Sequence, residues 1–158
     1  MSRSDAEQAI AALRARSASV ACAESLTGGL LCATLVDVPG ASDVVRGAVV
    51  AYASDLKVSL LGVDPAALSR DGTVTESTAR AMASGVRERL GATYGVSTTG
   101  VAGPGADEGR PEGAVHLAVA GPRRVVHRAL RLDGGREAVR RASVARAVTL
   151  LLTELEQP

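Results

Sequence analysis

The chain has 158 residues, 46% of them hydrophobic, which fits one domain with its own core (residues 1–158) and excludes a disordered chain. A formal net charge of +1 gives no reason to expect nucleic acid or a membrane surface as a partner. No apolar run reaches the roughly 18 residues of a transmembrane helix, and the N-terminus lacks the apolar segment of a signal peptide, so we expect a cytoplasmic protein.

Predicted helices and strands alternate along the first half of the chain. A capping box formed by Ser4 and Glu7 precedes apolar residues at helical spacing, which predicts an N-terminal helix. The near-continuous apolar run from Val44 to Tyr52 predicts a strand that is buried on both faces. The expected elements are a helix at 4–16, a strand at 18–23, a turn at Ser25, a helix to about 36, a strand at 44–52, a helix at 54–60 and a helical turn from 64.

The second half of the chain adds two strands that we expect to form a hairpin. Gly121-Pro122 separates two apolar runs, which is typical of antiparallel neighbours joined by a tight turn. The expected elements are a helix at 75–90, a strand at 94–99, a glycine-rich loop at 100–111, paired strands at 113–120 and 125–132, and a helix at 136–155. This order predicts a three-layer α/β/α single domain with a mixed, mostly parallel sheet.

The segment 21–29, A-C-A-E-S-L-T-G-G, carries the first candidate site. Ser25 is expected at the end of a strand and near a helix N-terminus, where free backbone N–H groups and the positive end of the helix dipole gather. Gly28 and Gly29 have no Cβ, so a ligand can approach the backbone closely. The alternative is that Ser25 or Thr27 only caps the helix.

Three predicted loops are expected at one edge of the sheet. In parallel sheets, ligands bind outside the carboxyl ends of the strands. Ser25 follows the first strand, residues 52–57 follow the second and residues 98–105 follow the third. These groups converge if the three strands are parallel neighbours.

Lys57 is the only lysine among the 18 basic residues of the chain. It falls in the first turn of a predicted helix, where the dipole disfavours an ammonium by about 0.3–1 kcal/mol. A lowered pKa suits a general base, so Ser25 as nucleophile and neutral Lys57 as base form a candidate Ser-Lys pair. A lone surface lysine is the alternative. His116 and His127 lie within predicted strands and are interpreted as structural.

Further candidates flank this pair, each with an alternative interpretation. The glycine-rich loop lacks the known phosphate-binding motifs and could be a plain surface loop. Arg140 lies on the apolar face near a helix start, where it could clamp an anion or merely pack its stem. Tyr52 could hold Lys57, stack on a flat ring, or fill the core.

Five sequence blocks in one order resemble the CinA C-terminal domain family and together span about residues 4–155. The blocks are A-E-S-L-T-G-G (23–29), A-Y-A-S-D-L-K (51–57), G-T-V-T-E-S-T-A-R-A-M-A (72–83), T-G-V-A-G-P-G (99–105) and D-G-G-R-E-A-V-R (133–140).

The resemblance implies a Ser-Lys amidohydrolase that uses no metal or other cofactor. Ser25 would be the nucleophile and Lys57 the base, with Tyr52 and Thr99 supporting them and Arg140 near the substrate. The implied reaction hydrolyses nicotinamide mononucleotide to nicotinic acid mononucleotide and ammonia. The residues that we expect to bind substrate are Thr27, Gly28, Gly29, Thr99, Gly100, Gly103 and Arg140.

Two other functions fit the same residues, namely a non-catalytic nucleotide-binding module and an amidase for a different small amide. Larger members of the family carry an additional N-terminal nucleotide-processing domain, which we do not expect in this chain. We expect a small nucleotide as the ligand, no nucleic-acid or membrane partner, and assembly into a homo-oligomer.

Overall fold

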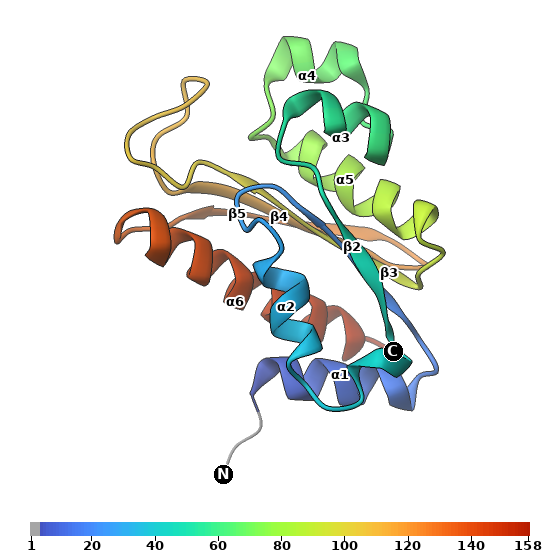
Figure 1. Ribbon diagram of the computed structural model, residues 1–158. Coiled ribbons are helices and arrows are strands. Elements are labelled where there is room, and N and C mark those ends of the chain that lie inside the picture. The colour runs from blue at the N-terminus through green and yellow to red at the C-terminus, as the bar shows by residue number, and fades with distance from the viewer. Residues whose placement is uncertain (1–3) are drawn as a thin grey trace.

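A five-stranded sheet with the order β2-β1-β3-β4-β5 lies between helices in the computed structural model, which describes residues 4–158 (Figure 1). The strands are β1 (Val20–Glu24), β2 (Val45–Val50), β3 (Tyr94–Gly100), β4 (Ala114–Ala120) and β5 (Val125–Arg131). The helices are α1 (Asp5–Ala15), α2 (Leu30–Val36), α3 (Ser54–Leu61), α4 (Pro65–Asp71), α5 (Glu76–Arg89) and α6 (Gly135–Leu155), with a short 3-10 helix η1 (Ala41–Asp43). Residues 1–3, part of the segment searched for a signal peptide, lie outside the described residues.

β1 is the central strand of the parallel half of the sheet. It pairs in parallel with β2 and β3, whereas β3–β4 and β4–β5 are antiparallel pairs. The predicted mixed sheet and hairpin are therefore confirmed, with as many antiparallel pairs as parallel ones. Glu24 at the end of β1 is in register with Val50 of β2 and Thr98 of β3. The three strands consequently finish at the same edge of the sheet.

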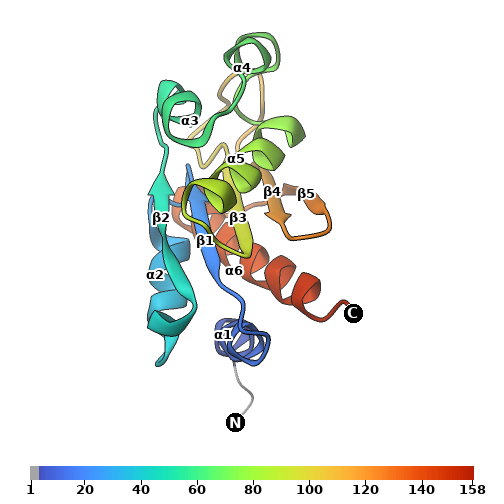
Figure 2. The ribbon, with the colours of Figure 1, turned by 90° about the vertical axis from the view of Figure 1, so that its right-hand side faces the viewer.

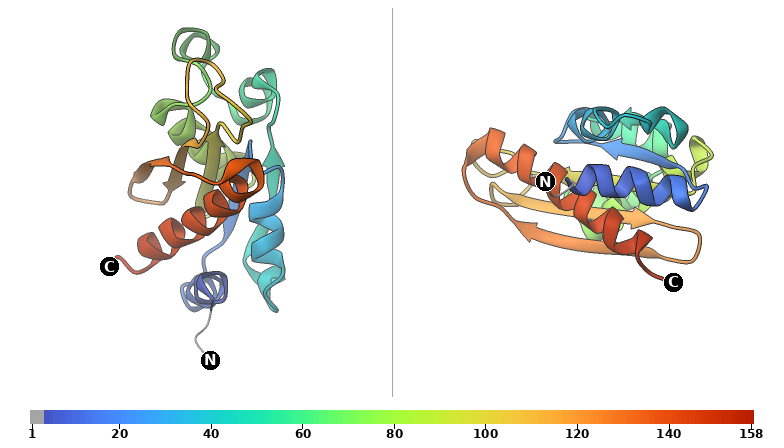
Figure 3. Two further views of the ribbon diagram at one scale, coloured as in Figure 1. Left: turned by 90° about the vertical axis from the view of Figure 1, so that its left-hand side faces the viewer. Right: turned by 90° about the horizontal axis from the view of Figure 1, so that it is seen from below.

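Helices cover both faces of the sheet, which confirms the predicted three layers. α1, α2 and α6 pack on one face and enclose the larger core, with α1 and α6 in contact (Figure 3). α5 covers the other face, and α3 and α4 stack beside it near the edge where β1, β2 and β3 end (Figure 2). The capping box of Ser4 and Glu7 is present at the start of α1, as predicted. Within residues 4–158 no helix is long and apolar enough to cross a membrane.

The prediction that the second strand is buried on both faces is wrong. β2 lies at the edge of the sheet, where it pairs with β1, and Val50 at its end is 41% exposed. An apolar run indicates that the faces of a strand are packed against other elements. It does not show whether the strand pairs with a neighbour on one side or on both. The edge position leaves β2 only partly buried.

Helix α3, which carries Lys57, packs closely on α5 at Gly85. A Cβ at this position would lie 1.9 Å from the carbonyl oxygen of Leu61, the last residue of α3. Only glycine lets the two helices approach this closely, because any side chain would meet backbone rather than a flexible group. Gly85 therefore sets how closely α3 lies on α5.

Gly85→Ala tests this contact because two effects of opposite sign compete. Helix propensity favours alanine by about 1 kcal/mol, whereas overpacking against fixed backbone costs about 1–3 kcal/mol or more. We expect the clash to dominate and the free energy of unfolding to fall, as measured by urea denaturation. Ser84→Ala in the same helix is the matched control, with a change within about 0.5 kcal/mol. A Gly85→Ala protein as stable as the parent would contradict the close approach.

Candidate active site

A cleft of about 380 Å³ opens where β1, β2 and β3 end. Its walls come from the turn after β1, the start of α3, the segment before α5, the loop after β3 and the start of α6. The lining residues are Ser25, Leu26, Tyr52, Ser54, Lys57, Thr73, Val74, residues 100–108 and Arg136.

The structure divides the predicted site residues into two groups. The cleft is lined by Ser25, Tyr52, Lys57, Gly100 and Gly103. The residues that lie behind or beside it are Thr27, Gly28, Gly29, Thr99 and Arg140. The three loops therefore meet at one edge of the sheet. Half of the expected residues line the cleft, and the other half belong to the structure around it.

Ser25 begins the turn after β1 and is 8% exposed. Its backbone N–H donates to the carbonyl oxygen of Thr98 at 3.1 Å, which extends the pairing with β3 by one residue. On the other side, Ala51 N–H donates to the carbonyl oxygen of Glu24 at 2.9 Å. Both neighbouring strands thus hold the backbone up to the residue that carries the hydroxyl.

Lys57 reaches Ser25 from the first turns of α3 and is 1% exposed. Its Nζ lies 3.1 Å from Ser25 Oγ, 2.7 Å from the carbonyl oxygen of Ala51 and 3.3 Å from that of Tyr52. None of the ion pairs found in residues 4–158 involves Lys57. The amine is therefore buried among neutral oxygen atoms.

Burial lowers the pKa of Lys57, and the negative charge of Glu108 opposes part of that shift. A neutral amine has two N–H groups and one lone pair. The carbonyls of Ala51 and Tyr52 can accept the two N–H groups, which leaves the lone pair for the Ser25 hydroxyl. The arrangement suits a group that accepts a proton from Ser25.

Glu24 is the functional residue that sequence analysis missed. Its side chain is fully buried, and its carboxylate accepts from the N–H groups of Gly29 (3.0 Å), Leu31 (3.0 Å) and Cys32 (2.8 Å) and from the Thr27 hydroxyl (2.5 Å). The three N–H groups are donors that a helix start otherwise leaves unpaired, and α2 has no side-chain cap from its own N-cap residue. An acid just before an uncapped helix start was the available signal.

Two of the predicted threonines stabilise the walls. Thr27 Oγ1 bonds Glu24 and also lies 2.8 Å from Thr98 Oγ1, which ties the Ser25 turn to β3. Thr99 points to the opposite face, where its hydroxyl donates to the carbonyl oxygen of Thr73 at 2.8 Å. Thr99 therefore links β3 to the segment before α5 and lies behind the cleft.

Arg140, which we expected near the substrate, does not line the cleft. Its guanidinium donates to the carbonyl oxygens of Leu26 (2.8 Å) and Thr27 (3.1 Å), so it braces the turn that follows Ser25. Arg136, one helical turn earlier, lines the cleft instead. It donates to the Gly103 carbonyl oxygen at 2.5 Å and to the hydroxyl of Tyr52, which is 62% exposed, at 3.3 Å.

The predicted glycines serve the backbone in different ways. Gly28 and Gly29 have φ angles of +58° and +104°, which L side chains rarely adopt, and they turn the chain from β1 into α2. Gly100 lines the cleft at the end of β3, and a Cβ there would lie 2.8 Å from the Ala114 carbonyl oxygen. Gly103 also lines the cleft, at a φ of +91°.

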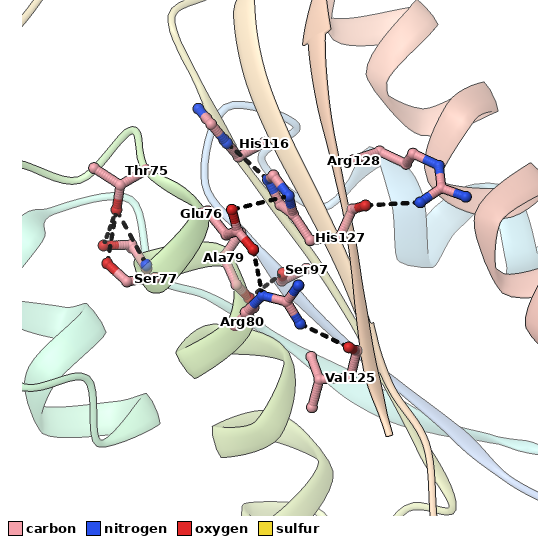
Figure 4. A network of polar contacts seen from close by, with 11 residues as sticks. Thr75, Glu76, Ser77, Ala79, Arg80, Ser97, His116, Val125, His127 and Arg128 are labelled. Carbon is pink, nitrogen blue, oxygen red and sulfur yellow. Dashed lines mark hydrogen bonds and ion pairs between the residues drawn. The ribbon is translucent and has the colours of Figure 1, made fainter. Parts of the chain in front are cut away.

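The two histidines form a separate network on β4 and β5 (Figure 4). His116 Nδ1 lies 2.8 Å from His127 Nε2 with the rings stacked, and His127 Nδ1 lies 3.7 Å from Glu76. Burial lowers the pKa of both rings. Neither ring lines the cleft, in agreement with their structural interpretation. The described residues contain no group of three or more metal-ligating side chains placed to hold an ion.

A sequence model of the CinA C-terminal domain matches residues 2–155. CinA-like proteins from Frankia casuarinae and Gloeobacter violaceus are 53% and 50% identical to this chain and align with 86% and 93% of it. The chain spans about a third of the length of these relatives, 31% and 35%.

Solved structures agree with this match. The competence/damage inducible protein CihA from Agrobacterium tumefaciens is 37% identical, with a TM-score of 0.90 over 99% of this chain and 100% of that one. A CinA superfamily protein from Klebsiella pneumoniae is 29% identical, with a TM-score of 0.92 over 96% of this chain and 95% of that one.

Glu24→Gln tests whether the buried carboxylate holds the Ser25 turn. The substitution replaces an acceptor oxygen with a donating NH₂ group that faces other N–H donors. We expect the free energy of unfolding to fall by about 2 kcal/mol or more, the range for losing a charge-assisted hydrogen bond in the interior. Glu137→Gln, in an exposed pair with Arg141, is the control and should change stability by less than about 1 kcal/mol. Equal stability losses in the two proteins would contradict the assignment.

Proposed function

Because the chain belongs to the CinA C-terminal domain family, we propose that it is an amidohydrolase that converts nicotinamide mononucleotide to nicotinic acid mononucleotide and ammonia. The observation that carries the proposal is the contact between a buried lysine amine and a serine hydroxyl, 3.1 Å apart, at the floor of a cleft. The substrate is the one that the family resemblance of the sequence implies.

In the first half of the proposed reaction, Ser25 becomes esterified. Its Oγ attacks the carboxamide carbon while the neutral amine of Lys57 takes the hydroxyl proton. The tetrahedral intermediate then collapses, the C–N bond breaks, and the Lys57 ammonium returns the proton to the leaving nitrogen, which departs as ammonia. During these steps the carbonyls of Ala51 and Tyr52 stabilise the transient ammonium.

In the second half, water releases the acid. Lys57 accepts a proton from water as its oxygen attacks the ester carbon, and the proton returns to Ser25 Oγ when the ester bond breaks. The developing oxyanion needs donors. Leu26 N–H is suited to this, because its residue lines the cleft and the hydrogen bonds of residues 4–158 include none that it donates. Arg140, which binds the Leu26 carbonyl, would hold the next peptide unit of the same turn.

One positively charged side chain of the cleft supports a nucleotide as the substrate. Arg136 presents a guanidinium at the start of α6, beside Tyr52 and the Gly103 carbonyl. A guanidinium is well suited to bind a phosphate. Arg136 is therefore the residue that we propose for the phosphate, in place of Arg140.

Two alternative functions differ from this proposal in the residues that they require. A non-catalytic nucleotide-binding module has no need of a buried lysine amine that contacts a serine hydroxyl. An amidase for another small amide would use the same Ser25 and Lys57 chemistry but would have no need of Arg136.

The proposal is tested by ammonia release from nicotinamide mononucleotide, measured as kcat/KM against pH. Ser25→Ala and Lys57→Arg should each lose at least about 10²-fold, the lower range for a removed general base, and arginine cannot take the proton because its guanidinium stays charged. Only the neutral lysine reacts, so the wild-type rate should fall as pH drops below the lowered Lys57 pKa.

The control for this assay is Ser59→Ala, an exposed serine on the same helix as Lys57, which should keep full activity. Thermal melts establish that each variant is folded. Near-normal ammonia release by a folded Ser25→Ala protein would exclude the covalent mechanism. Release from other small amides but none from nicotinamide mononucleotide would support the alternative amidase.

A further inference from the structure

Two acidic residues of the cleft have no part in the proposed reaction steps. Asp107 and Glu108 lie on the loop after β3, and with Lys57 and Arg136 they are the charged residues among those that line the cleft. If Lys57 works as a neutral amine, the cleft combines one cation with two carboxylates. A substrate that carried only a phosphate would find this excess negative charge unfavourable.

Glu108 is held in a fixed position by its own turn. Asp107 and Arg110 exchange backbone hydrogen bonds of 2.9 and 2.7 Å. Glu108 and Gly109 between them have φ angles of +49° and +71°, as in the tight turns of hairpins. A left-handed conformation is unusual for glutamate, and the turn imposes it.

The carboxylate of Glu108 is anchored on the cleft wall by one of its two oxygens. Oε2 accepts from the N–H of Thr73 at 2.8 Å and from its hydroxyl at 3.0 Å. Oε1 accepts no hydrogen bond within the part of the chain that the structure describes. A ligand in the cleft therefore meets a carboxylate that is oriented but still has a free oxygen.

The negative charge of Glu108 acts electrostatically at the proposed reaction site. It acts on the amine of Lys57, whose pKa it raises against the effect of burial. Any cation that stands between the Glu108 loop and the Ser25–Lys57 pair would be attracted by the same charge.

Nicotinamide mononucleotide has such a cation. Its ring nitrogen bears the ribose, so the pyridine ring that carries the carboxamide is positively charged. When the carboxamide carbon lies at Ser25, this ring must lie within the same cleft. The phosphate, at the other end of the ribose, extends away from the ring. An uncharged ring or an aliphatic amide has no positive charge for a carboxylate to attract.

We propose that Glu108 is a specificity-determining residue that selects N-substituted pyridinium carboxamides over uncharged amides. This inference rests on the proposed function, because it assumes that the carboxamide is presented to Ser25. The charges of the cleft then match those of the substrate at both ends, with Glu108 for the ring and Arg136 for the phosphate.

The alternative is that Glu108 only anchors its loop to Thr73. The two roles differ in their dependence on ligand charge. Loss of an anchor would weaken the binding of every ligand of the cleft, whereas loss of a charge would weaken only the binding of a ligand with a cationic ring. Glu108→Gln suits this comparison because the amide oxygen can still accept from Thr73.

The test measures binding to a Ser25→Ala protein by calorimetry, with two nucleotides as probes. One is nicotinamide mononucleotide, and the other is its 1,4-dihydro form, which has the same ribose, phosphate and carboxamide but no charge on the ring. Adding Glu108→Gln should lower the affinity for nicotinamide mononucleotide about three- to tenfold. The affinity for the 1,4-dihydro form should fall less than about twofold. Glu88→Gln, the same charge change at an exposed position of α5 outside the cleft, should leave both affinities within about twofold.

Equal weakening of the two nucleotides by Glu108→Gln would show that Glu108 is only an anchor, and unchanged affinities would also overturn the proposal. Ammonia release by the wild type separates this outcome from failure of the proposed function. Release of ammonia with an unchanged affinity ratio overturns the role of Glu108 alone. No release, together with no binding of either nucleotide, overturns both proposals.

Discussion

A lysine amine buried without a carboxylate partner is the constraint on which the rest of the site depends. An unpaired ammonium is costly in a protein interior, so burial favours the neutral form of Lys57. The carbonyls of Ala51 and Tyr52 then accept its two N–H groups and fix the orientation of the amine, so that its lone pair is directed at the Ser25 hydroxyl. Both carbonyls belong to the segment between β2 and α3, so the amine is positioned by the loop that leads into its own helix. The close packing of α3 on α5 at Gly85 holds that helix in place from behind.

The partner hydroxyl is positioned by two opposite charges that act on one turn. The carboxylate of Glu24 binds the free N–H groups at the start of α2, and the guanidinium of Arg140 binds the carbonyls of Leu26 and Thr27. Neither group needs to touch a substrate to serve this purpose. Together they fix the turn that follows the hydroxyl, which is the kind of support that a reacting group requires if its geometry is to be kept through the reaction. Arg140 is for this reason better understood as part of the scaffold than as an anion site.

The sequence permitted the prediction of the fold and of the Ser25–Lys57 contact because both depend on local patterns and one general rule. Apolar runs located the strands, and parallel neighbours place the residues that follow them at one edge of the sheet. The choice between Arg136 and Arg140 could not be made in this way. They lie one turn apart on the same helix, so their roles depend on how α6 is rotated against the Ser25 turn, which is a tertiary property. Glu24 was missed because it ends an apolar strand, and the edge position of β2 depends on pairing that composition does not encode.

The measurement that tests this account most directly is the pKa of Lys57 itself. The chain has a single lysine, so protein grown with ¹³C- and ¹⁵N-labelled lysine gives a single Nζ resonance that can be followed by NMR as pH is raised. The account predicts a titration midpoint clearly below the ordinary value of about 10.4, because burial disfavours the ammonium. The same resonance in urea-unfolded protein provides the reference and should titrate at the ordinary value. A folded-state midpoint at or above that reference would contradict the account, because Lys57 would then be a charged structural lysine rather than the base that activates Ser25.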